Sequence, residues 1–333
     1  MAGSKMTLQD VADLANVSKW TASRAFTPGA SISPAAKERV LAAAKTLGYR
    51  KNLLAQSLST NKTNLVGLVV DELANPYLFS VLDKLMTLLQ RQGQLCIVLN
   101  ISAHESYRKH IELVEQFQVD ALLFIGTSIT PDIVELTQTF SDMPFVVLFR
   151  ESLSQSIPFI TTRDFEASAE LANLLVEEGY KDFDYLAGPT NETTALRRLA
   201  GYRQGLSEQG YSISSVIEGE HYCRDEAYKR VLAHYQANRP KGYRALFCEN
   251  DILAVGAIDA LRALNLTHQV GVVGFDNITL ANATSYDLTT VEQPLDDILS
   301  AALAYIKNPT QARQQQYVSG KLIVRRSHKR SAF

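Results

Sequence analysis

The residues best suited to chemistry lie near the start of the chain, in the stretch SKWTASRAF at 18–26. On a helix, Trp20 and Arg24 are one turn apart and share a face, with Lys19 beside them. Three short hydroxyl donors lie among them: Ser18, Thr21 and Ser23. Cationic and hydroxyl side chains are the groups that contact phosphate oxygens and base edges of nucleic acids. We expect Trp20, the only tryptophan of the chain, to face nucleic acid. The alternative is a position in the core.

The charge of the chain is distributed unevenly. Residues 1–62 carry nine Lys and Arg against three Asp and Glu, whereas the remaining residues carry 24 basic and 32 acidic side chains. The first segment therefore has a net charge of +6 and the rest of the chain −8, for a total of −2. A basic N-terminal segment on an acidic body is typical of a protein whose head binds a polyanion.

Helix-start and helix-stop signals place the basic segment in three short helices. Thr7 is followed three residues later by an acidic residue, which is the capping-box pattern, so a helix should begin after it. Ser18 can cap a second helix. Ser33, followed by a proline, predicts the start of a third helix that ends at Gly48. Two short helices joined by a tight turn, with a third behind them, form a helix-turn-helix, whose second helix enters the major groove.

From residue 65 onward, short apolar runs alternate with amphipathic stretches. Seven runs are predicted strands: LVGLVV (65–70), LCIVL (95–99), ALLFI (121–125), FVVLF (145–149), DYLAG (184–188), ALFC (245–248) and VGVVGF (270–275). The alternation indicates βαβ units and parallel sheets, in which ligands bind beyond the carboxyl ends of the strands. Polar residues after the predicted strands are therefore candidate ligand contacts: Asp71, Asn100, Thr127, Arg150, Asn250 and Asp276.

Composition and motifs narrow the function class. The chain of 333 residues is 46% hydrophobic and 20% charged, as globular proteins are, and it has no apolar run of the ~18 residues that a membrane helix needs. Its start lacks a secretory signal, and its three cysteines fit neither a disulfide framework nor a zinc site. We therefore expect a cytoplasmic protein without metal or cofactor. An enzyme is disfavoured, because we find no dinucleotide-binding loop, P-loop or nucleophile elbow. A transport-type sugar-binding protein is disfavoured by the missing signal and the basic head.

A series of motifs runs along nearly the whole chain. In order they are TLQDVADLANVSKWTASRAF (7–26), ISPAAKERVLAAAKTLGY (32–49), NLLAQSLSTNKTNLVGLVV (52–70), NPY (75–77), RRLAGYRQGL (197–206), CENDILAVGAIDAL (248–261), VGVVGFDNI (270–278), LTTVEQP (288–294) and LIVRRS (322–327). Together they resemble the LacI/GalR family of bacterial transcription repressors. The resemblance implies an all-α helix-turn-helix head and an α/β two-lobed effector domain like the periplasmic binding proteins, with parallel sheets and three crossovers.

The resemblance also implies domain boundaries. Residues 1–48 would form the helix-turn-helix domain, 49–63 the hinge helix and linker, and 64–333 the effector-binding and dimerisation domain. Within the last domain, the N-lobe would comprise about 64–161 and 293–320, and the C-lobe about 162–292 and 321–333.

For the head, the resemblance implies that Lys19, Trp20 and Arg24 read bases. The positions that commonly hold the DNA backbone match Thr7, Ser18, Thr21, Ser23, Thr27, Ser33 and Asn52. Residues 52–60 would form a hinge helix on the operator, where Ala55 and Leu58 contact DNA and Leu58 is an apolar wedge in the minor groove. The alternative for Leu58 is an exposed linker leucine. Trp20 and Thr27 depart from the residues usual at their positions, so operators of relatives do not transfer directly.

For the body, the resemblance implies an effector site between the lobes. Arg198 matches an arginine that clamps the effector, and Asp276 matches an acid that accepts hydrogen bonds from it. Further predicted contacts come from the resemblance or from positions after strands: Asn75, Tyr77, Thr127, Arg150, Thr194, Tyr222 and Asn250. A purely structural role is the alternative for each of these, as when Asn250 caps the following helix.

Arginines near the predicted site bear on the charge of the effector. If Arg150, Arg163 and Arg198 all approach the cleft, the effector should be an anionic sugar acid or sugar phosphate, because arginine forks match carboxylates and phosphates. The alternative is that Arg150 and Arg163 form surface salt bridges with Glu151 or Asp164, and the effector is a sugar without such a group.

The combined expectation is a repressor without catalytic activity, controlled allosterically by a small-molecule effector. One three-helix head makes few base contacts, so two heads related by a two-fold axis should read a palindromic operator, with half-sites about one helical turn apart. The last motif is followed by only a few residues without leucine heptads, so we expect a homodimer.

Overall fold

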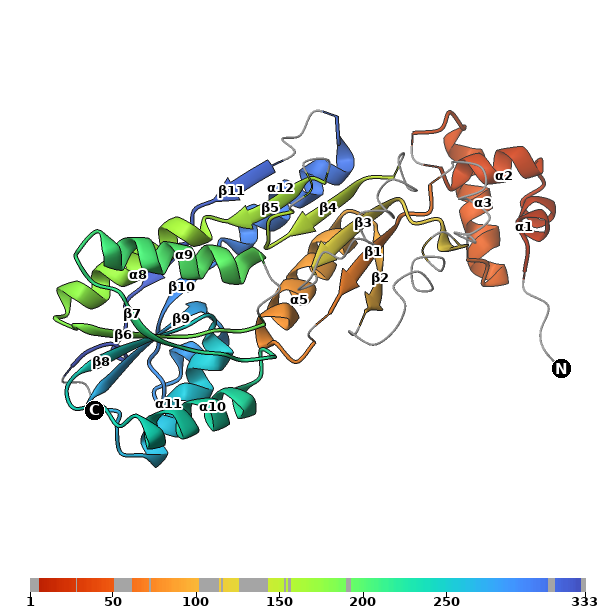
Figure 1. Cartoon of the computed structure of the whole chain (residues 1–333). Coiled ribbons are helices and arrows are strands. Elements are labelled where there is room, and N and C mark those ends of the chain that lie inside the picture. The colour runs from red at the N-terminus through yellow and green to blue at the C-terminus, as the bar shows by residue number, and fades with distance from the viewer. Residues whose placement is uncertain are drawn as a thin grey trace. The chain divides into compact units, whose positions relative to one another are not determined.

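The computed structural model describes residues 6–27, 29–50, 62–71, 73–101, 114, 116–125, 143–152, 154, 157–189, 193–310 and 315–330. The chain forms two compact units, Met1–Thr63 and Asn64–Phe333. The first contains the N-terminal helices, and the second contains two sheets with their covering helices (Figure 1). In the part of the chain that the structure describes, no helix is long and apolar enough to cross a membrane.

The first unit contains the three predicted helices: α1 (Leu8–Leu14), α2 (Lys19–Ala25) and α3 (Pro34–Leu47). The three predicted N-caps are confirmed, because the side chains of Thr7, Ser18 and Ser33 each accept a hydrogen bond from a backbone N–H in the first turn. Gly48 ends α3 with φ of 63°, a left-handed conformation that glycine adopts readily. The core between the helices is made of small side chains: Val11, Ala12, Ala15, Ala22, Ala25, Val40, Ala43 and Ala44.

The N-lobe of the second unit contains a six-stranded parallel sheet in the order β11-β5-β4-β3-β1-β2. Its strands are β1 (Leu65–Val70), β2 (Leu95–Asn100), β3 (Ala121–Ile125), β4 (Phe145–Leu148), β5 (Phe159–Thr162) and β11 (Gln315–Val318). One face of the sheet packs against α5 (Pro76–Arg91) and α12 (Leu295–Lys307). The central strands are buried on both faces, which explains their nearly continuous apolar sequences.

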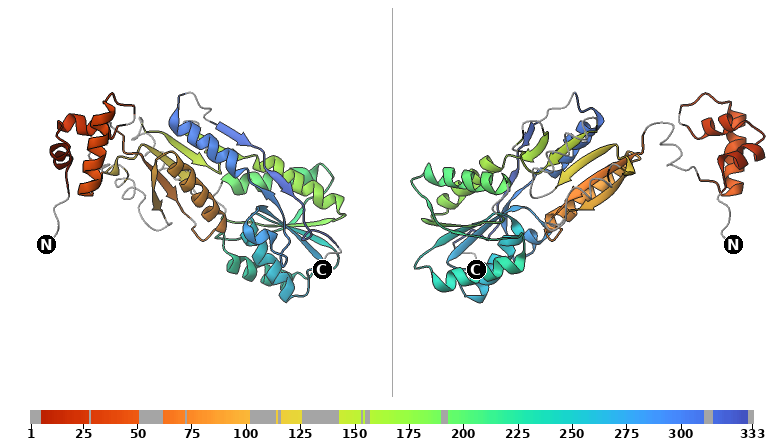
Figure 2. Two further views of the ribbon diagram at one scale, coloured as in Figure 1. Left: turned by 180° about the vertical axis from the view of Figure 1, so that it is seen from behind. Right: turned by 45° about the vertical axis from the view of Figure 1, so that its right-hand side comes forward.

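The C-lobe contains a second six-stranded sheet in the order β12-β10-β9-β8-β6-β7, parallel except for the antiparallel β12. Its strands are β6 (Asp182–Leu186), β7 (Ile213–Ile217), β8 (Arg244–Cys248), β9 (Val270–Asp276), β10 (Thr289–Glu292) and β12 (Lys321–Ile323). Its helices are α8 (Asp164–Glu177), α9 (Thr193–Ser207), α10 (Arg224–Ala237), α11 (Asp251–Ala263) and the short η1 (Thr279–Asn282). Figure 2 shows α8 and α9 on one face of the sheet and α10 and α11 on the other.

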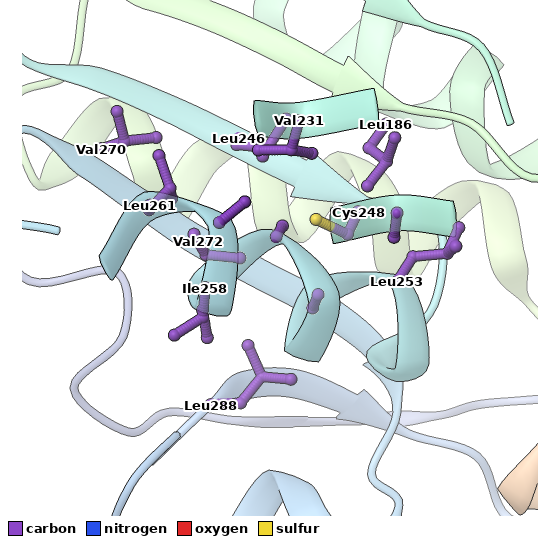
Figure 3. Close-up of a cluster of buried hydrophobic side chains, with 14 of the residues drawn as sticks. Leu186, Val231, Leu246, Cys248, Leu253, Ile258, Leu261, Val270, Val272 and Leu288 are labelled. Carbon is purple, nitrogen blue, oxygen red and sulfur yellow. The ribbon is translucent and has the colours of Figure 1, made fainter. Parts of the chain in front are cut away.

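Two buried clusters lie on the two faces of the C-lobe sheet. Figure 3 shows the cluster between the sheet and α10 and α11, where strand residues such as Leu246 and Val272 meet helix residues such as Val231 and Ile258. On the opposite face, α8 and α9 cross closely at Gly201. A Cβ at this position would overlap the carbonyl oxygen of Phe165, so only glycine allows this approach.

The chain passes between the two sheets three times: from β5 to α8, from β10 to α12 and from β11 to β12. The predicted two-lobed α/β architecture with three crossovers is confirmed. All seven predicted strands are present, with bounds that differ by up to two residues. The apolar pattern did not predict β5, β7, β10, β11 and β12, which are short strands with polar residues or at sheet edges.

Candidate functional site

The exposed face of α2 carries the residues predicted to meet DNA. Trp20 is 67% exposed, so the alternative that it belongs to the core is wrong. The guanidinium of Arg24 lies over its ring, 4.2 Å from the ring centre. Lys19 is also exposed. The head's core is instead completed by the half-buried Phe26, whose ring centre lies 5.7 Å from that of Tyr49.

The predicted backbone-contacting hydroxyls lie within α2 or at helix ends and are exposed or half-buried. The Ser18 Oγ accepts a hydrogen bond from the backbone N–H of Thr21 at 3.1 Å. The Thr27 hydroxyl donates to the carbonyl oxygen of Ser23 at 3.1 Å. Thr7 and Ser33 are held in the same way by the caps of α1 and α3. Asn52, Ala55 and Leu58 lie outside the described residues.

A pocket of about 70 Å³ lies between the two lobes. Eight of the nine predicted effector contacts line it: Asn75, Tyr77, Arg150, Thr194, Arg198, Tyr222, Asn250 and Asp276. The ninth, Thr127, lies outside the described residues. Asp71, another polar residue after a predicted strand, also lines the pocket, whereas Asn100 is exposed at the end of the edge strand β2.

The carboxyl ends of the strands supply half of the polar lining, where ligands bind in doubly wound sheets. Arg150 follows β4, Asn250 follows β8 and Asp276 ends β9. The backbone is strained at two of these points, since Phe149 has φ of 64° and Asp276 has φ of 115°. Non-glycine residues with such dihedrals are uncommon and concentrate at binding sites.

Arg198, on α9, is the centre of the pocket's charges and is only 5% exposed. Its Nε donates to Asp164 Oδ1 at 3.0 Å, and its Nη1 donates to the main-chain carbonyl of Glu249 at 2.8 Å. Its Nη2 lies 3.7 Å from Asp276 Oδ1, and its guanidinium lies 3.8 Å from the centre of the Phe275 ring. Burial opposes the charge, but Asp164 and Asp276 raise the pKa of Arg198, so it remains cationic.

The acids around Arg198 are harder to ionise than usual. Burial raises the pKa of Asp276 to about 6, although Arg198 attracts the carboxylate. Burial also raises the pKa of Asp164 and of Glu249. Glu249 accepts a hydrogen bond from the Tyr222 hydroxyl at 2.5 Å, which anchors the tyrosine ring at the pocket.

Gln293 and Phe149 line the pocket but were not predicted. The Gln293 Nε2 donates to Asp276 Oδ1 at 2.7 Å, and the Thr162 hydroxyl donates to Gln293 Oε1 at 2.8 Å. Thr162 and Gln293 stand at two different crossovers, so hydrogen bonds join the carboxylate of Asp276 to both of them. Gln293 directly follows β10, and polar residues after predicted strands were the candidates for ligand contacts. Gln293 was missed because the sequence pattern did not predict β10.

Two predicted contacts also cap helices. The Oδ1 of Asn75 accepts from the N–H of Tyr77 at 3.0 Å at the start of α5, and that of Asn250 accepts from the N–H of Leu253 at 3.1 Å at the start of α11. Each of these side chains therefore caps a helix and also lines the pocket. The buried hydroxyl of Tyr77 has no hydrogen-bond partner among the described residues.

The three arginines considered for an anionic effector do not converge. Arg163 is exposed outside the pocket, with its Nη1 3.4 Å from Glu166 and its guanidinium 5.9 Å from the Tyr317 ring centre. Only Arg150 and Arg198 line the pocket, together with two aspartates. The formal charges of these four lining residues cancel, so the lining as a whole is not cationic.

Comparisons with known proteins identify the family. Residues 7–52 match the profile of bacterial regulatory proteins of the lacI family, and residues 63–303 match the periplasmic binding proteins and sugar binding domain of the LacI family. The chain belongs to the LacI family. It is a DNA-binding transcriptional repressor with a sugar-binding domain, and it is not an enzyme.

Individual LacI-family relatives match over most of their length. The HTH-type transcriptional repressor PurR of Histophilus somni (strain 129Pt) is 29% identical over 86% of this chain and 87% of that protein. PurR of Pasteurella multocida (strain Pm70) is 28% identical over 97% of this chain and 98% of that protein. The lac repressor dimer bound to operator and the anti-inducer ONPF has a TM-score of 0.86 at 22% identity, covering 99% of this chain and 100% of that one.

Proposed function

We propose that this repressor is a homodimer whose two heads bind a palindromic operator and whose pocket binds a small carbohydrate-type effector. The observation that carries the effector site is the convergence of eight expected contacts, from both lobes, on one pocket. The proposed domains are 1–48, 49–63 and 64–333, with lobes of about 64–161 and 293–320, and of about 162–292 and 321–333. The division of the chain at Thr63 into two compact units supports the main boundary.

The proposed operator contacts are the base-reading Lys19, Trp20 and Arg24 and the backbone-holding residues Thr7, Ser18, Thr21, Ser23, Thr27, Ser33 and Asn52. Ala55 and Leu58 of the hinge complete the set. Their support is the exposed face of α2 and the basic charge of the head. Two heads on one two-fold axis match half-sites about one helical turn apart. The lac repressor, whose fold is similar, likewise binds its operator as a dimer.

The lining of the pocket indicates the chemistry of the effector. Buried carboxylates accept hydrogen bonds from hydroxyls, while apolar and aromatic side chains such as Phe149 and Tyr222 cover the faces of a sugar ring. The space of about 70 Å³ favours a compact ligand over a drug-sized one, whose pockets are about 300–1,000 Å³. A related structure of similar fold, at 23% identity and a TM-score of 0.67, is a CelR–cellobiose complex.

The charge of the effector depends on Arg150. Arg198 donates to Asp164 and to a main-chain carbonyl, and its Nη2 lies 3.7 Å from Asp276, so buried acids of the protein already balance its charge. A sugar acid or sugar phosphate would therefore place its anionic group at Arg150, which lines the N-lobe side of the pocket.

The effector can be identified by thermal-shift screening of the full chain against sugars, sugar acids, sugar phosphates and purine bases. We expect a carbohydrate to raise Tm and to alter the binding of a palindromic operator in a mobility-shift assay. Arg150→Met should abolish the shift produced by an anionic ligand, whereas the surface control Arg163→Gln should retain it. Stabilisation by purine bases alone would overturn the carbohydrate proposal.

A further inference from the structure

The exposed Trp20 and the half-buried Arg24 on α2 have a geometry that separate base contacts would not require. The two residues are four positions apart and therefore neighbours on one face of the helix. The Arg24 guanidinium lies 4.2 Å from the centre of the indole ring, within the range of a cation–π interaction. Trp20 remains 67% exposed, so this contact buries little of it against the protein.

No carboxylate competes for Arg24 among the described residues of the head. The two acids of α1 have other hydrogen-bond partners, since Asp10 accepts from Thr7 and Asp13 accepts from Gln9. Within the described part of the head, the Arg24 guanidinium lies over the indole and forms no salt bridge. The charge of Arg24 is therefore oriented by an aromatic surface and not by a salt bridge.

This arrangement leaves the N–H donors of the guanidinium available for hydrogen bonds to DNA. A cation–π contact occupies the face of the guanidinium plane, whereas its N–H donors lie along the edge. Those edge donors match the O6 and N7 acceptors of guanine in the major groove, the commonest specific contact of arginine with DNA. Indole offers one donor and cannot form such a bidentate pair itself.

We infer that Trp20 is a positioning residue: its ring holds the Arg24 side chain so that Arg24 reads one guanine in each operator half-site. The inference rests on the proposed base-reading role of α2. Without the ring, the long arginine side chain samples more rotamers and loses part of its preference for guanine when it docks. If Trp20 instead contacted a thymine directly, its replacement would reduce the preference for thymine and leave the preference for guanine intact. The positioning role and a direct contact of Trp20 therefore predict losses at different bases.

The test starts with selection of half-sites from randomised DNA by the full-length protein. Affinities are then measured for the selected operator and for operators changed at each position, with Trp20→Leu, Trp20→Phe, Arg24→Ala and the double variant Trp20→Leu/Arg24→Ala. An exposed cation–π contact predicts that Trp20→Leu reduces guanine discrimination about 2- to 5-fold per half-site. Trp20→Phe should retain part of it, because a ring remains. Leu41→Ala, an exposed change on α3, is the matched control and should have no effect on discrimination.

The double variant decides the inference. If Trp20 acts through Arg24, Trp20→Leu should reduce guanine discrimination in the parent but cause no further loss in the Arg24→Ala background. Equal losses in both backgrounds, or loss of a thymine preference with the guanine preference intact, would overturn the positioning role. If instead Arg24→Ala selects the same sites as the parent, the proposed base-reading role of α2 fails, which is a separate result.

Discussion

Replacing Asp276 with Asn should stabilise the effector-binding unit at neutral and alkaline pH. Burial raises the pKa of this carboxyl from 3.8 to about 6, so keeping it ionised in the folded protein is unfavourable. A difference of about 2 pKa units corresponds to about 3 kcal/mol. Asn resembles the protonated acid, tolerates the positive φ at this position and can still accept the hydrogen bond from Gln293.

The attraction between Asp276 and Arg198 limits this gain but does not reverse it. The raised pKa of Arg198 indicates a favourable charged pair, whereas the raised pKa of Asp276 indicates an unfavourable buried charge. Burial dominates at Asp276, because Arg198 is 3.7 Å away and donates its closer bond, at 3.0 Å, to Asp164. We therefore expect a net gain of about 1–3 kcal/mol, which for a unit of this size raises Tm by roughly 2–10 °C.

The gain should depend on pH in one direction. Between pH 3.8 and about pH 6 the folded protein holds the proton of Asp276 more tightly than the unfolded chain does. The stability of the parent therefore falls as pH rises through this range, and the full cost applies above it. The advantage of Asp276→Asn over the parent should accordingly be largest near pH 8 and shrink towards zero near pH 4.

Calorimetric unfolding of both proteins across this pH range measures the difference directly. Asp184→Asn is the matched control: this buried carboxylate accepts from Arg244 at 3.0 Å, from Ser215 at 2.7 Å and from Tyr235 at 2.8 Å. Its replacement should destabilise the protein, because an amide loses charge-assisted bonds. An Asp276→Asn protein that is less stable than the parent at pH 8, or whose advantage does not change with pH, would refute the reasoning.

Three further variants probe the rest of the molecule. Arg198→Ala should lower the free energy of unfolding by about 3–5 kcal/mol, because Asp164 and Asp276 lose their buried cation. The same variant should abolish the effector response in a mobility-shift assay. Gly201→Ala should lower it by about 1–3 kcal/mol in denaturant unfolding, since the new methyl group pushes α9 away from Phe165; an unchanged midpoint would contradict the close helix crossing. Leu58→Ala should weaken operator binding with effector affinity unchanged, if this residue is the minor-groove wedge; equal operator affinity in a titration would remove that assignment.

Local sequence was enough to predict the elements whose determinants lie within a few residues. The N-caps at Thr7, Ser18 and Ser33 depend only on a side chain and the backbone N–H groups of the next turn. The seven buried strands were likewise visible, because a strand covered on both faces is apolar along its whole length. β7, by contrast, alternates serine with apolar residues at a sheet edge and carries too weak a pattern.

Similarity of motifs was enough to predict the family and most of the pocket, including Arg198 and Asp276. The surroundings of two other residues were decided only by the tertiary structure. Trp20 is exposed because alanines already fill the core side of α2. Arg163 precedes α8 and pairs with Glu166 on the surface, although its type and position in the sequence resemble those of a ligand contact.

The polar residues after strands show most clearly what each level of structure determines. Asn100 and Asp276 both end a strand, and the sequence by itself determined that each should lie at a carboxyl edge. The order of strands in the sheets then separated them, because β2 is an edge strand whereas β9 lies between β8 and β10. Gln293 reaches Asp276 because β10 pairs with β9 in the same sheet. It reaches Thr162, 131 positions away, because each of the two residues lies where the chain crosses between the lobes. Such contacts depend on which segments pack together across the whole chain, so no local pattern encodes them.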